Sequence, residues 1–260
     1  MNPGLRIVTE PPVLEVVIDR PKANAIDAAT SRLMGEAFQA FRDNPDFRVA
    51  ILTGAGDRFF SAGWDLTAAA EGESYEADWG PGGFGGFTEL EGLNKPVICA
   101  VNGIAAGGGF EIVLAADLVV AAETAQFLLP EALLGFPPDT GVVRLPRQIP
   151  PAIAKEMLLT GRRMGAEEAA RWGLVNQVVP ASELMEASRL LARRICEAAP
   201  LATEAILEMI RATFHMGVAE AMAHIRAGEV ASYRAALDSP DAVEGSRAFA
   251  EKRPPRWTGA

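Results

Sequence analysis

The sequence predicts an α/β core followed by a helical C-terminal region, and two patterns support this prediction. Over residues 1–199, short apolar runs alternate with helical patterns, which favours a core with largely parallel sheets. Over residues 200–260 nearly every pattern is helical, and no strand remains to complete a sheet. We therefore expect a core that carries the functional site and a helical tail that packs on the core, on neighbouring subunits, or on both.

The elements of both regions can be assigned in order along the chain. Apolar and β-branched runs predict strands at residues 13–18, 49–53, 96–101, 118–121 and 174–179. Helical spacing predicts helices at residues 30–41, 108–115, 154–159, 166–172, 182–198, 201–213, 219–237 and 242–251. Residues 79–87 (WGPGGFGGF) are expected to form a mobile loop that carries aromatic side chains.

Composition and charge exclude several classes of protein. A chain of 260 residues that is 49% hydrophobic can bury a sizeable core, which excludes a disordered or fibrous protein. The 34 acidic residues exceed the 24 Lys and Arg residues and give a net charge of −10, so nucleic acid is not an expected partner. Cys99 and Cys196 lie in apolar and helical stretches and predict no disulfide framework. Without a signal-like start or a membrane-length apolar run, the protein is expected to be soluble and cytoplasmic.

The first stretch that suits chemistry is residues 105–111 (AAGGGFE), which follows a predicted strand and opens a helix. Its glycines let the backbone approach a ligand, and the unpaired amides of a first helical turn can donate to an oxyanion. Taken alone, such glycines more often serve close helix packing. Glu111 favours a functional interpretation, because a carboxylate in an apolar helix is costly to bury without a partner or a purpose.

Two further stretches are ambiguous when each is taken alone. Residues 127–135 (FLLPEALLG) place Glu131 among apolar residues, although a lone glutamate after proline is usually an exposed residue of a first helical turn. Residues 59–66 (FFSAGWDL) form a glycine-containing turn after a strand pattern. The combination of all three stretches is more informative than any one of them.

In this order and at this spacing, the three stretches resemble the signatures of the crotonase family of enoyl-CoA hydratases and isomerases. The similarity covers nearly the whole chain and includes RPKANA at residues 20–25, RLPR at 144–147, LTG at 159–161, WGLV at 172–175 and EKR at 251–253. It implies a ClpP/crotonase-like spiral of ββα units with a helical tail that organises trimers, often paired into hexamers. It also implies an acyl-CoA substrate, so that coenzyme A is part of the substrate and no cofactor is permanently bound.

The resemblance also implies roles for individual residues. Glu111 and Glu131 match the catalytic carboxylates, and the backbone amides of Trp64 and Gly108 match the donors of an oxyanion hole. The positions that match contacts to the substrate or to coenzyme A are Lys22, Ala23, Ala25, Ala62, Asp65, Leu66, Asp139 and Lys252. The loop that contains Lys22, Ala23 and Ala25 is one residue shorter than the form common in the family. No metal is expected, because the only two histidines lie in helical patterns.

The implied chemistry is the addition of water to a 2-enoyl-CoA or its removal from the hydrated product. Donors at the thioester oxygen stabilise the charge that develops there, and a carboxylate pair can activate water and move the α-proton. In the dehydration direction we expect Glu131 to remove the α-proton and Glu111 to protonate the departing hydroxyl. The presence of both favours a hydratase over an isomerase. Asp139, where many hydratases have a small residue, is either a third acid or base or an exposed turn residue.

Four segments are similar to a branch of the family that converts carnitinyl-CoA to crotonobetainyl-CoA: residues 20–27, 60–66, 80–84 and 161–169. A trimethylammonium group is best held by aromatic faces and carboxylates. Candidate residues for this are Trp64, Trp79, Phe84 and Phe87, with Asp139 as a counter-charge. The alternative for residues 79–87 is a lid with apolar anchors. The alternative functions are a generic enoyl-CoA hydratase or isomerase of fatty-acid degradation and a non-catalytic scaffold, which would not need two acids among apolar residues.

Overall fold

A six-stranded sheet lies at the centre of the structure, a computed structural model that describes residues 4–260. The first three residues of the expected core lie outside the described residues. In spatial order the strands are β1 (Leu5–Glu10), β2 (Val13–Ile18), β3 (Val49–Gly54), β5 (Val97–Val101), β7 (Leu118–Ala122) and β10 (Gln177–Val179). Only β1 pairs antiparallel, and the central strands β3 and β5 are buried along their whole length. Burial on both faces explains their continuous apolar sequences.

A second, four-stranded sheet consists of short strands, three of which directly follow the long strands β3, β5 and β7. Its order is β4 (Phe59–Ser61), β6 (Ile104–Ala106), β8 (Gln126–Leu128) and β9 (Met164–Gly165). Each pair of strands β3–β4, β5–β6 and β7–β8 leads into a helix, which is α2 (Leu66–Ala70), α3 (Gly108–Ala115) or α4 (Glu131–Leu134), respectively. These repeated ββα units confirm the expected spiral.

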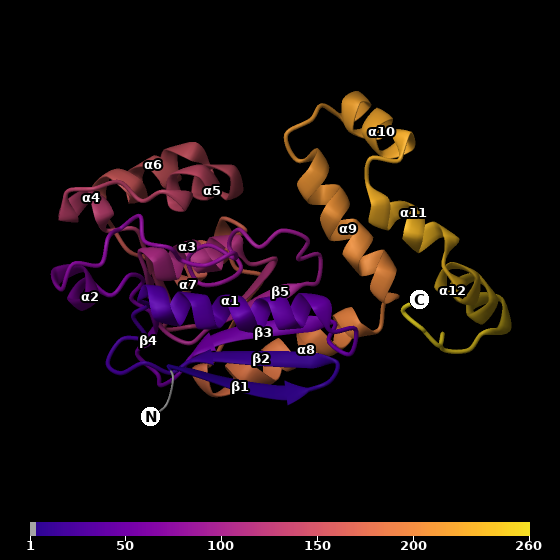
Figure 1. Cartoon of the computed structure of the whole chain (residues 1–260), viewed down its shortest axis with the longest axis horizontal. Helices are drawn as coiled ribbons and strands as arrows, with labels where there is room; N and C mark the ends of the chain where they lie inside the picture. The colour runs from indigo at the N-terminus through magenta and orange to yellow at the C-terminus, as the bar shows by residue number, and fades with distance from the viewer. Residues whose placement is uncertain (1–3) are drawn as a thin grey trace.

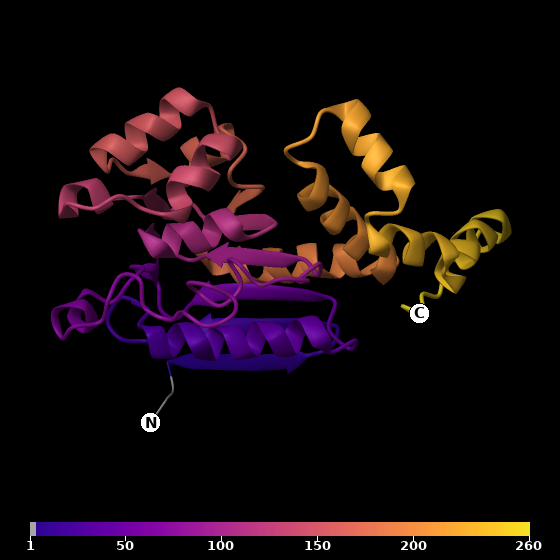
Figure 2. The same ribbon diagram turned by 45° about the horizontal axis from the view of Figure 1, so that its top comes forward.

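Helices cover both faces of the six-stranded sheet. On one face, α8 (Leu184–Cys196) packs its Leu184 and Ala192 against Val49, Ile51 and Ile98. On the other face lies the larger core, to which α1 (Ala28–Asp43) and α3 contribute. Beyond α3 follow α5 (Thr140–Gln148), α6 (Pro151–Thr160) and α7 (Ala166–Arg171); α4, α5 and α6 form an outer layer (Figures 1 and 2). This outer layer and α2 surround the site described below.

The C-terminal helices extend away from the core, at the opposite end of the molecule from α2 and α4 (Figure 1). They are α9 (Pro200–Thr213), α10 (Val218–Ala227), α11 (Ala231–Asp238) and α12 (Pro240–Glu251). The prediction of one helix over residues 219–237 is wrong, because Gly228 ends α10 in a left-handed conformation with φ of 84°. No helix of the described chain is long and apolar enough to cross a membrane.

Residues 79–87, expected as a mobile loop, are instead packed against α1. The Ser31 hydroxyl donates to the Gly83 carbonyl at 3.1 Å and accepts from the Gly85 amide at 3.1 Å. A Cβ atom on Gly86 would lie 2.4 Å from the backbone nitrogen of Gly35. The glycines therefore permit close contact between two backbones, and this contact fixes the aromatic residues between them.

Candidate active site

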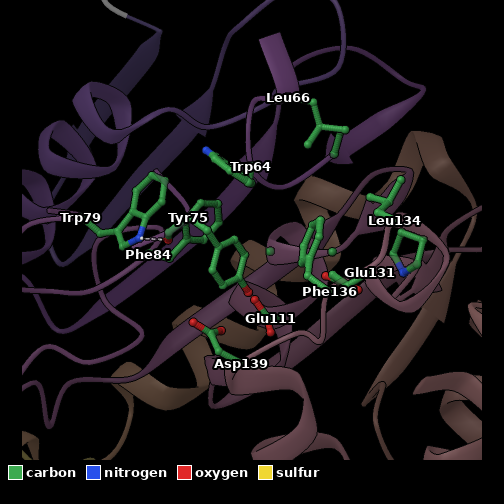
Figure 3. A pocket seen from close by; sticks show the side chains of 14 residues that line it. Trp64, Leu66, Tyr75, Trp79, Phe84, Glu111, Glu131, Leu134, Phe136 and Asp139 are labelled. Carbon is green, nitrogen blue, oxygen red and sulfur yellow. Dashed lines mark hydrogen bonds between the residues drawn. The ribbon is translucent and has the colours of Figure 1, made fainter. Parts of the chain in front are cut away.

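The segments that follow β4, β6 and β8 converge on one pocket of about 580 Å³, which is open to solvent (Figure 3). The pocket brings together seven of the predicted site residues: Ala62, Trp64, Leu66, Gly108, Glu111, Glu131 and Asp139. Its wall also contains Tyr75 and Phe136, which the sequence analysis missed. Each of the three ββα units therefore supplies one part of the same site.

Glu111 is buried in the first turn of α3, with 6% of its surface exposed. Its Oε1 accepts a hydrogen bond of 2.7 Å from the backbone N–H of Gly141 at the start of α5. Burial raises its pKa to about 7, and the negative charges of Asp139 and Glu131 add to this effect, whereas the Gly141 bond opposes it. Glu111 can therefore gain or lose a proton near neutral pH.

Glu131 is the first residue of α4 and is also only 6% exposed, so the alternative of an exposed first-turn residue is wrong. Gly107 allows its approach, because a Cβ atom there would lie 2.9 Å from the Glu131 Oε1. Burial raises the pKa of Glu131 to about 7, and the charge of Asp139 contributes. Among the described residues its buried Oε2 has no hydrogen-bond partner. An unpaired carboxylate oxygen in a pocket is suited to act on a ligand.

Two backbone amides beside the carboxylates are free to donate. Gly63, with φ of 80°, accepts from the amide of Ile26, and the amide of Asp65 donates to the Ile26 carbonyl. Trp64 lies between these two hydrogen bonds, and Gly108 is the first residue of α3. Within residues 4–260, the backbone N–H groups of Trp64 and Gly108 therefore donate to no other group. A Cβ atom on Gly63 would lie 2.6 Å from the Gly108 nitrogen, which shows how closely the two segments approach. Two free donors at such close segments suit an oxyanion.

Aromatic side chains also line the pocket, beside the acids. The ring centroid of Tyr75 lies 5.4 Å from that of Trp64 and 5.3 Å from that of Phe136. The indole N–H of Trp64 donates to a carboxylate oxygen of Glu73 at 2.9 Å, which fixes the orientation of the ring. Of the aromatic residues in segment 79–87, two reach the pocket, with ring centroids 5.0 Å apart: Trp79 and Phe84.

Phe87 does not contribute to this wall, contrary to its prediction as an aromatic candidate. It is buried in the core, with its ring centroid 4.7 Å from that of Phe38. Tyr75 and Phe136 line the pocket in addition to Trp79 and Phe84 of segment 79–87. No local pattern marks either of them, because both reach the pocket from irregular segments after short helices.

Asp139 is exposed, as one of the two alternatives from the sequence expected, but it also lines the pocket. It is exposed, and it caps the N-terminus of α5 by accepting from the Thr140 amide. Its carboxylate nevertheless belongs to the pocket wall and lies on the same side as Glu111 (Figure 3). The structure thus places a third negative charge beside the buried pair.

The other predicted contact residues lie outside the pocket wall. Ala23 accepts from the Ala62 amide at 2.9 Å, and Ala25 accepts from Arg20 at 2.6 Å. The Asp65 side chain caps α2. Lys22 is exposed beside this group, whereas Lys252 ends α12 in the C-terminal region, at the opposite end of the molecule from α2 and α4 (Figure 1). Within one chain, Lys252 therefore does not reach the pocket.

The raised pKa of Glu111 predicts that this residue destabilises the protein above neutral pH. Below pH 4.5 Glu111 is protonated in both the folded and the unfolded state, so it does not affect stability. Between pH 4.5 and 7 it loses its proton in the unfolded state first, and the folded state becomes less stable relative to the unfolded state. Above pH 7 this loss of stability is complete. Glu111→Gln should therefore raise the free energy of unfolding by about 1 to 3 kcal/mol at pH 8 and by little near pH 4.5. Urea unfolding at both pH values, at one protein concentration, measures this difference. Glu36→Gln, at an exposed position on α1, is the control and should show no such pH dependence.

Comparison with known proteins agrees with this geometry. A family model described as enoyl-CoA hydratase/isomerase matches residues 9–260. The carnitinyl-CoA dehydratases of Salmonella arizonae and Salmonella typhi are 59% and 60% identical to the chain, over 100% of both sequences. Crystal structures of enoyl-CoA hydratases from Mycobacterium marinum and Mycobacterium tuberculosis match with TM-scores of 0.90 and 0.91 at 38% and 39% identity, over 100% of each chain. The chain belongs to the enoyl-CoA hydratase/isomerase, or crotonase, family.

Proposed function

We propose that this hydro-lyase reversibly adds water across the double bond of a 2-enoyl-CoA and that its substrate pair is carnitinyl-CoA and crotonobetainyl-CoA. The observation that carries the proposal is the meeting of two buried carboxylates and two free backbone amides in one pocket. The names of the relatives at 59% and 60% identity support the choice of acyl group.

The roles of the site residues follow from their chemistry. The amides of Trp64 and Gly108 bind the thioester oxygen and stabilise the charge that develops when the α-carbon loses its proton. In the dehydration direction, Glu131 accepts the α-proton on its unpaired Oε2, and Glu111 donates a proton to the departing hydroxyl, so that water leaves. One glutamate must begin the cycle ionised and the other protonated. Their pKa values of about 7 make this division accessible near neutral pH.

Coenzyme A enters as part of the substrate, and the proposal requires no permanently bound cofactor. In an acidic protein its phosphates need local cations, and Lys22, beside the pocket segment, is the candidate within the chain. Lys252 could serve only in the site of another subunit, because α12 lies at the opposite end of the molecule from α2 and α4 (Figure 1).

Self-association into trimers or paired trimers is part of the same proposal. The C-terminal region, residues 200–260, exposes large apolar side chains that a single chain leaves uncovered: Ile206, Ile210, Phe214, Val218, Val243 and Phe249. Such a surface is typical of an interface between subunits. Sedimentation would test it, and a monomer at micromolar concentration would contradict it. The cytoplasmic location expected from the sequence stays a prediction.

A spectroscopic assay tests the proposed reaction. Hydration removes the absorbance of the conjugated enoyl thioester, so the purified protein should bleach that band with crotonobetainyl-CoA and restore it with carnitinyl-CoA. Crotonyl-CoA lacks the cationic group, so its kcat/KM should be at least about tenfold lower than that of crotonobetainyl-CoA. A preference for crotonyl-CoA would favour the generic enoyl-CoA hydratase, which the names of the structural relatives suggest. Absence of turnover with all three thioesters would overturn the proposal.

A further inference from the structure

The pocket joins an aromatic wall to a group of negative charges. Trp64, Tyr75 and Phe136 come from three separate segments, yet their ring centroids all lie within 6.5 Å of one another. The ring of Tyr75 faces the other two, while its hydroxyl points toward the carboxylates (Figure 3). Burial, and then the charge of Asp139, raises the pKa of the Tyr75 hydroxyl, so the phenol stays neutral in this anionic setting.

Positive charge is missing from this wall. Among the described residues that line the pocket there are three carboxylates, Glu111, Glu131 and Asp139, and no Lys, Arg or His. Arg144 of α5 interacts electrostatically with Glu111, but it donates to the Thr88 carbonyl at 2.6 Å and does not line the pocket. A pocket lined by several carboxylates and by no basic side chain favours a ligand that carries a positive charge.

We infer that Trp64, Tyr75 and Phe136, together with Asp139, form a subsite for a quaternary ammonium group on the acyl chain and that Asp139 determines specificity there without taking part in proton transfer. The inference rests on the proposed function and deepens it. A quaternary ammonium cannot donate hydrogen bonds, so ring faces and a nearby anion are the groups that can recognise it. In a 4-trimethylammonio chain the nitrogen follows directly on the γ-carbon, beyond the carbons on which the glutamates act.

The position of Asp139 separates its role from that of the glutamates. Both glutamates are buried, and the unpaired oxygen of Glu131 is free to act on a ligand. The carboxylate of Asp139 is exposed and caps α5. It is therefore placed to attract a cation over a short distance, while the buried pair carries out the proton transfers.

Binding of two saturated thioesters tests the subsite independently of turnover. The probes are 4-(trimethylammonio)butanoyl-CoA and its neutral isostere 5,5-dimethylhexanoyl-CoA, in which carbon replaces the nitrogen. By calorimetry, the wild type should bind the cationic probe about tenfold or more tightly than the isostere. Asp139→Asn, which can still cap α5, should lower affinity for the cationic probe about tenfold and change that for the isostere less than threefold. Tyr75→Leu should also act mainly on the cationic probe.

A matched charge control and a kinetic readout complete the experiment. Asp43→Asn removes an exposed aspartate paired with Arg42 at the C-terminal end of α1, and it should leave both affinities unchanged. If Asp139 were a third acid or base, Asp139→Asn would lower kcat equally for crotonobetainyl-CoA and for 5,5-dimethylhex-2-enoyl-CoA. Equal binding of the two probes by the wild type, or an equal loss of both in Asp139→Asn, would overturn the subsite. Selective binding without any turnover would instead overturn the proposed reaction alone.

Discussion

Glu131→Gln should lower kcat for dehydration by about 10²–10⁴-fold, the range typical of a lost general base. Glutamine has nearly the same size and fits beside Gly107, but it cannot accept the α-proton at neutral pH. Since the proposed donors to the thioester oxygen are backbone amides, affinity for an unreactive thioester such as butanoyl-CoA should change little. Stopped-flow absorbance gives kcat, and calorimetry gives the dissociation constant.

The two glutamates can be distinguished by isotope exchange. If Glu131 is the base for the α-carbon, deuterium from solvent should enter the α-position of butanoyl-CoA in the wild type and in Glu111→Gln but not in Glu131→Gln. NMR follows this exchange without requiring a leaving hydroxyl. Glu36→Gln serves again as the exposed control and should behave as the wild type. Normal exchange in Glu131→Gln would show that another group removes the proton.

Gly63→Ala should lower kcat by about 10²–10³-fold, because it disturbs the two backbone amides proposed to bind the thioester oxygen. The new Cβ atom would lie 2.6 Å from the Gly108 nitrogen and 2.7 Å from the Ala106 carbonyl oxygen, so the two backbone segments must move apart. Glu111 and Glu131 are both retained in this variant. The expected loss is therefore in kcat more than in the affinity for butanoyl-CoA.

Gly173→Ala is the matched control for this variant. Gly173 has φ of 82°, close to the 80° of Gly63, but a Cβ atom there would meet nothing within 4 Å. Both variants should bear a similar backbone strain of about 1 to 2 kcal/mol, and only Gly63→Ala should lose activity. Circular dichroism and urea unfolding establish that both are folded at the assay temperature. Equal kcat values for the two variants would remove the amide pair from the mechanism.

The sequence predicted the parts of the fold that carry strong periodicity. The buried strands β2, β3, β5 and β7 were predicted closely because they are rich in apolar and β-branched residues, and α3 was predicted at its observed bounds. The short strands β4, β6, β8 and β9 have only two or three residues each, too few to show an alternation. The edge strand β1 was also missed, since most of its residues are exposed or only partly buried.

The candidate site could be predicted only in part, and for a physical reason. The burial of Glu131 depends on Gly107, which lies on a different unit of the spiral, so the residues next to Glu131 in sequence could not distinguish a buried from an exposed carboxylate. Resemblance to a family supplied this pair and the amides. Tyr75 and Phe136 had neither a local pattern nor a family signature, and only the three-dimensional packing shows that they face the same space as Trp64.

Different units of the spiral supply the residues proposed to bind the thioester oxygen and those proposed to contact the acyl chain. The proposed donors for the thioester oxygen come from the units that end in α2 and α3, whereas Glu131, Phe136 and Asp139 lie within nine consecutive residues, 131–139, after β8. A library confined to residues 132–139 would leave both backbone amides and both glutamates unaltered. Exchange of this single segment is therefore the most economical route to an enzyme of the same chemistry with a preference for neutral or bulkier acyl chains.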